Sequence, residues 1–331
     1  MRITKVTLIA TAIFSSSLAY ASEGLSVVTS IKPIHSLVSA VMDGIGTPSL
    51  IVEGAGSPHT YALKPSQAKA LQDADLVFWV GPAIESFLEK PIKEVASSAR
   101  IVTLSDAHGL IKIKYREGEN FDSHDDHAKH DDHDDHAKHE DHAKHDDHDD
   151  HAKHEDHGQF DMHMWLDPKN AKTIVNVIEE ALIKADPHNI KAYQGNAVSV
   201  KRHLDQLITE VDAELVPVKG KPYVVFHDAY QYFENRFGMT SVGSITVSPE
   251  VLPGAKRVKA LREKIKSLNA TCVFSEPQFE PKLIATVIEN TSAGAGVLDP
   301  LGASINVGPE MYFTLIRNMS KSLKKCLQRG N

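Results

Sequence analysis

The chain has 331 residues, of which 41% are hydrophobic and 24% charged, and its formal net charge at pH 7 is −8 with histidine neutral. A chain of this length can form two domains with separate hydrophobic cores. The negative charge comes from residues 124–157, which hold fourteen acidic side chains against four lysines, whereas the rest of the chain carries +2. Because no basic stripe with interleaved aromatic residues occurs, the composition excludes a nucleic-acid-binding surface.

Residues 1–21 have the features of a secretory signal peptide. Arg2 and Lys5 precede a short apolar stretch, and an Ala-Tyr-Ala sequence ending at Ala21 fits the small-x-small cleavage pattern. The apolar stretch is too short for a comfortable transmembrane span, and no later segment reaches that length. No cysteine lies near the cleavage point to carry a lipid. We therefore expect a soluble, exported protein without a lipid anchor.

Apolar runs then alternate with helical patterns. Residues 25–30 (LSVVTS) predict a buried strand, and residues 33–44 predict a helix that ends at a glycine. The series continues with a strand, a helix and two further strands at residues 48–52, 66–75, 76–81 and 100–106. This alternation predicts β/α units around a parallel sheet.

The pattern stops after about residue 106 and resumes with an amphipathic helix within residues 162–187. Residues 187–216 predict one helix of about 45 Å, long enough to cross between two lobes. A second β/α series follows, with strands at 222–229, 271–277 and 295–300 and helices at 230–238, 256–269, 281–292 and 310–327. We expect a signal peptide (1–21), an N-terminal α/β lobe (22–186) with a disordered His/Asp-rich loop at about 122–158, a linking helix (187–216) and a C-terminal α/β lobe (217–331).

The chain has two cysteines, Cys272 and Cys326. In an oxidising compartment, such a pair predicts one disulfide. Closing a loop of that length stabilises the fold by roughly 4 kcal/mol. The alternative is a pair of thiolate metal ligands, but the close C-x-x-C spacing of zinc sites is missing.

Four side chains that could bind a metal lie at the ends of predicted strands or in the loops next to predicted elements. In open parallel sheets, ligands bind outside the carboxyl ends of the strands. His59 lies in the loop after a strand and His163 lies just before a helix, whereas His227 and Asp299 end strands. Two of the four come from each lobe, so a site between the lobes would need both.

Three imidazoles suit Zn²⁺, whereas Mn²⁺ would require more carboxylate oxygen. The fourth position could be filled by Asp299 or by a water. Glu276 and Asp228 could lie behind the ligands and hold an imidazole in the required tautomer. The alternatives are that each histidine is a hydrogen-bonded loop residue, and that Asp299, which precedes a proline, is a turn residue or a helix cap.

Several motifs extend this interpretation to a known family. They are SIKPIHSLV, GAGSPHTYALKPSQAKALQDADLVFWVGP, MHMWLDP, VFHDAYQYF, and CVFSEPQF with LDPLG. Together they resemble the periplasmic zinc-binding proteins of bacterial ABC zinc importers, the zinc branch of the cluster A-I (cluster 9) solute-binding family. The resemblance covers the mature chain apart from the repeats. It implies two four-stranded (β/α) lobes joined by a rigid long helix, with metal in the cleft between the lobes.

The resemblance also assigns the ligands. The zinc ligands of the family fall on His59, His163 and His227, and His227 stands where the manganese branch carries Glu, which favours zinc. Some zinc members carry Glu immediately before the first histidine, but this chain has Pro58. That departure leaves water or Asp299 as the fourth ligand. The two cysteines match a disulfide in zinc-type relatives.

Histidine recurs at every third position of the His/Asp-rich segment, residues 124–157. A helix would turn successive imidazoles by about 300°, and a polyproline-II strand would place them about 9 Å apart, so neither forms a rigid tetrahedral site. With almost no apolar residues, the segment is predicted to be disordered without metal. It could be an accessory, low-affinity zinc collector or sensor, or a solvated acidic loop without a required role. Its candidate ligands are His124, His127, His130, His133, His136, His139, His142, His145, His148, His151, His154 and His157.

The sequence therefore predicts a periplasmic, monomeric binding protein that captures Zn²⁺ as cargo and delivers it to an inner-membrane ABC permease, docking on that transporter peripherally. Two other functions are open. A zinc hydrolase would also use three histidines, but H-E-x-x-H is missing and Glu276 would have to act as the base. A metal-dependent adhesin would require attachment to the cell surface, which the signal peptide does not suggest. We expect no enzymatic activity.

Overall fold

The computed structural model describes residues 24–116, 160–246, 253–268, 270–279 and 282–328. The predicted signal peptide (1–21) and the His/Asp-rich segment with its twelve histidines lie outside the described residues. Among the described residues, no helix combines the length and the apolar character that a membrane span requires.

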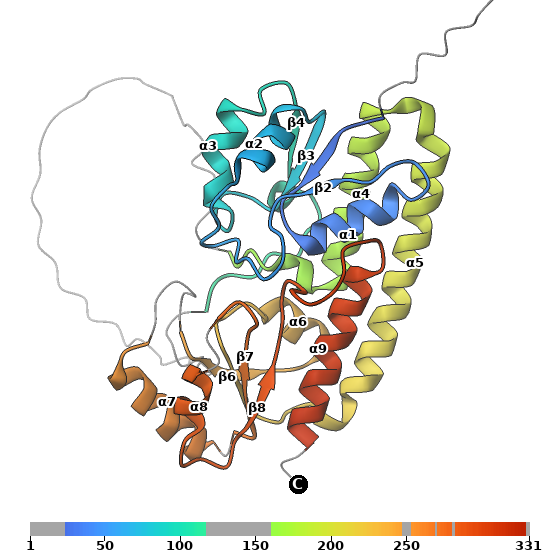
Figure 1. The fold of residues 1–331 in the computed structure, drawn as a ribbon. Helices are drawn as coiled ribbons and strands as arrows, with labels where there is room; N and C mark the ends of the chain where they lie inside the picture. The colour runs from blue at the N-terminus through green and yellow to red at the C-terminus, as the bar shows by residue number, and fades with distance from the viewer. Residues whose placement is uncertain (1–23, 117–159, 247–252, 269, 280–281, 329–331) are drawn as a thin grey trace, which may run out of the picture.

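The first lobe is built on a four-stranded parallel sheet with the order β2-β1-β3-β4. Its strands are β1 (Val27–Thr29), β2 (Ser49–Leu50), β3 (Leu76–Trp79) and β4 (Arg100–Thr103). Strand β1 pairs with β2 and with β3, so that Val28 lies opposite both Ser49 and Val77. Helices α1 (Lys32–Val41), α2 (Pro65–Gln72), α3 (Ser86–Glu94) and α4 (Pro168–Ala185) belong to this lobe (Figure 1).

The second lobe repeats this arrangement. Its parallel sheet has the order β6-β5-β7-β8, so in both sheets the lobe's first strand lies between its second and third strands. The strands are β5 (Tyr223–Val225), β6 (Ser241–Ser244), β7 (Cys272–Ser275) and β8 (Gly294–Val297). The helices are α6 (Gln231–Phe237), α7 (Ala255–Ser267), α8 (Lys282–Ile288) and α9 (Met311–Leu327). The predicted α/β class with two parallel four-stranded sheets is confirmed.

The long helix α5 (Ile190–Leu215) runs beside both lobes, with α9 next to it (Figure 1). Its buried positions recur every three or four residues and so form one apolar face; they are Tyr193, Ala197, Val200, Leu204, Leu207, Val211 and Leu215. This face packs on α4, α9 and α1. The larger hydrophobic cluster contains residues of both lobes, from Val27 in β1 to Phe274 in β7, and a second, smaller cluster lies within the second lobe. The lobes therefore share a packed core and have little freedom to separate at a polar hinge.

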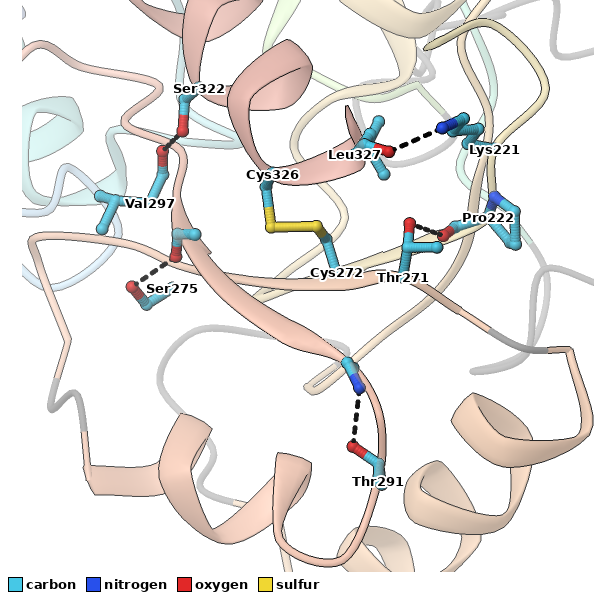
Figure 2. The surroundings of a disulfide bond; sticks show 12 residues. Lys221, Pro222, Thr271, Cys272, Ser275, Thr291, Val297, Ser322, Cys326 and Leu327 are labelled. Atoms are coloured by element: carbon cyan, nitrogen blue, oxygen red, sulfur yellow. Dashed lines mark hydrogen bonds between the residues drawn. A yellow bond between two sulfur atoms is a disulfide. The ribbon is translucent and has the colours of Figure 1, made fainter. Parts of the chain in front are cut away.

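The predicted disulfide between Cys272 and Cys326 is present (Figure 2). It joins the first residue of β7 to the last turn of α9, and the S–S distance is 2.02 Å. The bond closes a loop of 54 positions, which corresponds to roughly 4 kcal/mol of stabilisation. Because α9 also packs on α5 and α1, the disulfide fastens the second sheet to the helices shared by both lobes.

Two elements were not predicted from the sequence. Helix α3 contains Pro91, which lacks an N–H and weakens a helical pattern. Strand β6 reads Ser-Val-Gly-Ser, so it has neither the apolar run nor the alternation by which strands are recognised, and it is formed by pairing with β5 at the edge of the sheet. The strand predicted at 48–52 is shorter in the structure, where β2 has two residues.

Candidate metal centre

His59, His163 and His227 lie together between the two lobes. Each offers one ring nitrogen, and these three nitrogens all lie within 4.8 Å of one another. The ring centroids of His163 and His227 are 5.2 Å apart, and those of His59 lie 5.5 Å and 5.7 Å from them. His163 and His227 are buried, and His59 is half-buried.

Local structure brings each histidine to this point. His59 lies in the loop between β2 and α2, and His227 lies two residues beyond the carboxyl end of β5. His163 precedes a short 3₁₀ turn, Met164–Leu166, which leads into α4. Helix α4 begins there because Asp167 accepts a hydrogen bond from the backbone N–H of Lys169 as N-cap, with proline at the first helical position.

Two buried carboxylates set the orientation of the rings. Asp161 Oδ1 lies 2.7 Å from Nδ1 of His163, and Glu276 Oε1 lies 2.7 Å from Nδ1 of His227. When it is ionised, each carboxylate accepts the hydrogen bond, which places the proton of the imidazole on Nδ1 and the lone pair on Nε2. Carboxylate–imidazole pairs of this kind fix the tautomer and raise the basicity of a metal-binding histidine.

The Nε2 atoms of His163 and His227 lie 3.4 Å apart. Two nitrogens bound tetrahedrally to one Zn²⁺ at 2.0–2.1 Å are about 3.3 Å apart. The spacing of His163 and His227 therefore fits a shared zinc ion without further movement.

Burial keeps two of the imidazoles uncharged. It lowers the pKa of His59 to about 2 and that of His163 to about 3, and the charges of the neighbouring histidines add to both effects. Burial also opposes a charge on His227, but the carboxylates of Glu276, Asp161 and Asp228 together outweigh it and raise the pKa of His227 above its ordinary value. At neutral pH, the site thus presents at least two unprotonated imidazoles to a cation.

The pocket between the three rings is small, with a free volume of about 10 Å³. This volume is close to that of one water-sized sphere. Apolar parts of the wall come from both lobes, and they are Pro58, Trp165, Phe279, Pro300 and Leu301. The pocket accommodates an ion and has no room for an organic substrate.

Asp299 is not brought into this group of described residues. Its carboxylate accepts hydrogen bonds from the backbone N–H groups of Leu301, Gly302 and Ala303 at 2.6–3.1 Å, and from the side chain of Gln278 at 3.1 Å. This is the hydrogen bonding of a turn, the alternative noted for an Asp-Pro sequence.

The two acidic residues expected behind the ligands differ in their contacts. Glu276 reaches an imidazole, as described above. Asp228 lies next to His227 in the chain but forms an ion pair with Arg116, 3.4 Å away. Burial raises the pKa of Asp228 to about 7, against the effect of Arg116.

Asp161 was not predicted from the sequence as a residue of the site. Its signal is an acidic residue two positions before a histidine in FDMHMW, where the Asp161 side chain also accepts a hydrogen bond from the backbone N–H of His163 at 2.9 Å. Burial raises the pKa of Asp161 to about 7, although this hydrogen bond favours the charged form.

Comparisons with known proteins identify zinc-uptake proteins as relatives of this chain. Residues 27–326 match a family described as "Zinc-uptake complex component A periplasmic", ZnuA. The high-affinity zinc uptake system protein ZnuA of Brucella suis is 56% identical over 317 residues, which cover 95% of this chain and 94% of the relative. The protein of the same name from Paracoccus denitrificans is 40% identical, covering 96% and 97% of the two chains. A crystal structure of a ZnuA protein superposes with a TM-score of 0.72 at 22% identity, covering 92% of this chain and 100% of the other, and shows the same fold.

Proposed function

The chain belongs to the ZnuA family of periplasmic zinc-uptake components, and from this membership we propose how it takes up and passes on its cargo. It binds Zn²⁺ in the periplasm and works with an ABC permease. The ligands are Nε2 atoms of His163 and His227 and a ring nitrogen of His59. The observation that supports this assignment is the 3.4 Å spacing of the two buried Nε2 atoms, each backed by a carboxylate.

The assignment is tested by removing one imidazole from each lobe. His59→Ala and His227→Ala should each abolish tight zinc binding in titration calorimetry while the far-ultraviolet circular dichroism is unchanged. His188→Ala is the control, because His188 lies in a 3₁₀ turn before α5, away from the site. All variants should lack residues 124–157, so that zinc bound there does not obscure the result. Unchanged zinc affinity in both site variants would remove these residues from the site.

We propose water as the fourth ligand. Pro58 occupies the position at which the pocket could have received an acidic residue from the His59 loop, and it lines the pocket. Asp299 is engaged by four hydrogen bonds elsewhere. A three-histidine site with an open position also describes catalytic zinc. The pocket of about 10 Å³ speaks against a hydrolase, and membership in a zinc-uptake family does not favour an adhesin.

We propose that the mature protein begins after Ala21, carries no lipid, and acts as a monomer without enzymatic activity. Its lobes correspond to residues 22–186 and 217–331, joined by residues 187–216. Because both lobes share one hydrophobic core, small movements of the lobes accompany binding. Docking on the permease then releases zinc by separating ligands of different lobes.

The His/Asp-rich segment is proposed to collect zinc for this site. Among the described residues on either side of it, Lys114 and Phe160 form an antiparallel bridge, and Asp161 follows Phe160 directly. The described chain on both sides of the segment thus lies close to the site that contains His163. Deleting residues 124–157 should lower the zinc stoichiometry and slow zinc uptake under scarcity. Unchanged stoichiometry, uptake and transfer would show that the segment has no such role.

A further inference from the structure

Helix α6 of the second lobe begins four residues after His227 and lies against the first lobe. It packs on the 3₁₀ turn Met164–Leu166 and on α5. The side chains of Gln231, Tyr232, Glu234 and Arg236 each bond to a first-lobe residue. Most of α6 is buried, and it ends at Gly238 in the left-handed conformation (φ 65°). A helix this short, with so many polar contacts to the other lobe, is anchored by that lobe as much as by its own.

Arg236 contacts its carboxylate partner through two hydrogen bonds. Its Nε and Nη2 atoms donate to Oδ1 and Oδ2 of Asp167 at 2.6 Å and 2.7 Å, a bidentate pair. Asp167 is the N-cap of α4 and lies four residues after His163. Bidentate arginine–carboxylate pairs fix the relative orientation of the groups as well as adding energy. The pair therefore connects the segment that follows His227 with the segment that follows His163.

The N-terminal end of α6 forms hydrogen bonds to the segment that precedes His163. The Gln231 side chain donates to Asp161 Oδ2 at 3.3 Å. The Tyr232 hydroxyl donates to the Asp161 carbonyl at 2.7 Å and accepts from the backbone N–H of Ile113 at 3.1 Å. Asp161 is the residue that orients His163. Contacts of α6 thus flank His163 on both sides along the chain.

From this arrangement we propose that α6 is an inter-lobe clasp, which holds His163 and His227 at ligand spacing before zinc arrives, and that Arg236 is a positioning residue of the zinc site. The proposal rests on the ligand assignment above and extends it. Arg236 does not touch the metal; it acts through Asp167 and the turn that carries His163. Zinc leaves when ligands of the two lobes separate, and such a separation must break the contacts of α6.

A weakened clasp increases the population of conformations in which the two Nε2 atoms are too far apart to share an ion. The apparent zinc affinity then equals the intrinsic affinity multiplied by the fraction of molecules in which the two atoms are close enough to share an ion. The zinc dissociation rate should rise, because partial opening becomes more frequent, whereas the ligands themselves are unchanged. These effects differ from a loss of overall stability, which would leave the zinc dissociation rate of the folded protein as it is.

The test is a double-mutant cycle on Arg236→Gln and Asp167→Asn in protein whose zinc binding has been established. Asparagine keeps the ability to cap α4, so the cycle isolates the inter-lobe pair. Zinc dissociation is followed by stopped flow into an excess of a chromogenic chelator. We expect Arg236→Gln to raise the dissociation rate roughly three- to tenfold, with no further increase in the double variant. The Co²⁺ form should keep its tetrahedral absorption bands, because the three imidazoles remain.

Arg317→Gln is the control, because Arg317 also pairs with a carboxylate on another helix: its Nε donates to both carboxylate oxygens of Glu210 on α5, at 2.9 Å and 3.0 Å. Tyr232→Phe removes the hydrogen bonds of the Tyr232 hydroxyl at the N-terminal end of α6 but keeps the buried ring. This variant replaces Arg236→Gln in the test if Arg236→Gln folds poorly. Wild-type dissociation rates in both α6 variants, or an equal increase in Arg317→Gln, would overturn the proposal. Failure of the ligand assignment gives a different result: His59→Ala and His227→Ala proteins would then bind zinc as tightly as the wild type.

Discussion

Replacing Glu276 by glutamine should weaken zinc binding without disturbing the three ligands. Glu276 Oε1 lies 2.7 Å from Nδ1 of His227, and the side chain is 1% exposed. Glutamine has the same shape and can still accept the Nδ1–H hydrogen bond, but it lacks the negative charge that makes Nε2 a stronger donor to the metal. Loss of such a partner lowers metal affinity by about 10- to 100-fold, or about 1.4–2.7 kcal/mol.

The same change can be read from thermal unfolding. At saturating zinc, the stabilisation by the metal differs between two variants by RT times the logarithm of their affinity ratio. A mature chain of about 310 residues unfolds with an entropy of about 0.65 kcal/mol/K, so the zinc-induced rise in Tm should be about 2–4 °C smaller in Glu276→Gln. Affinity is measured directly by competition with a chelator of known affinity.

Glu289→Gln is the control, because its carboxylate is 62% exposed and pairs with Arg262, outside the site. Zinc affinity within twofold of the wild type in Glu276→Gln would refute the role of the carboxylate in tuning His227. A loss greater than about a thousandfold would also refute it, since it exceeds the effect of an indirect partner and would identify Glu276 as a ligand.

Three further outcomes are expected. In the zinc-free protein without its His/Asp-rich segment, NMR should show His59 and His163 neutral from pH 8 to pH 5, because burial lowers the pKa of both to about 2 and about 3. Since the unfolded state binds protons at these residues below its pKa of about 6.5, their contribution to stability falls with decreasing pH; titration midpoints near 6.5 would contradict this. Replacing Cys272 and Cys326 by serine should lower the free energy of unfolding in urea by roughly 4 kcal/mol with zinc affinity unchanged, and a loss of zinc binding would contradict it. Asp299→Asn should cost about 1–2 kcal/mol of stability in the same assay, with zinc affinity within threefold of wild type, whereas a hundredfold loss would make Asp299 a ligand.

His59 and His227 could be singled out in the sequence because an open parallel sheet places functional groups at strand ends, whereas His163 was singled out just before a helix and all three were matched to the motifs of the family. His227 follows a strand whose apolar run is unmistakable, and His59 follows another. Asp161 lies two residues before His163 and ahead of the same predicted helix, but nothing in the local sequence indicates that a carboxylate at this position contacts an imidazole. Asp299 lies at a strand end like the others, but its side chain is turned to the backbone N–H groups of its own loop. Position along the chain thus predicts which loops meet, but not the direction of each side chain.

The two β/α series and the long helix were also predictable, since their apolar patterns are long and regular. Strand β6 and the clasp formed by α6 were not, because both depend on partners distant in sequence. Arg236 and Asp167 are 69 positions apart, and nothing in their local sequences indicates that they pair. Contacts of this kind are fixed by the packing of α5 and α9 against both lobes, which the pattern of a single segment does not encode.

In the proposed zinc site, two nearby carboxylates can compensate for the charge of a buried dication. A buried ion is costly unless it is compensated nearby. Asp161 and Glu276 supply two negative charges, each one imidazole removed from the metal, and together they match the charge of Zn²⁺. Burial raises the pKa of Asp161 to about 7, although hydrogen bonds and the nearby charges of His227 and Arg116 favour its ionised form. A Zn²⁺ ion bound as proposed would add to these charges, so zinc binding and ionisation of Asp161 should favour each other.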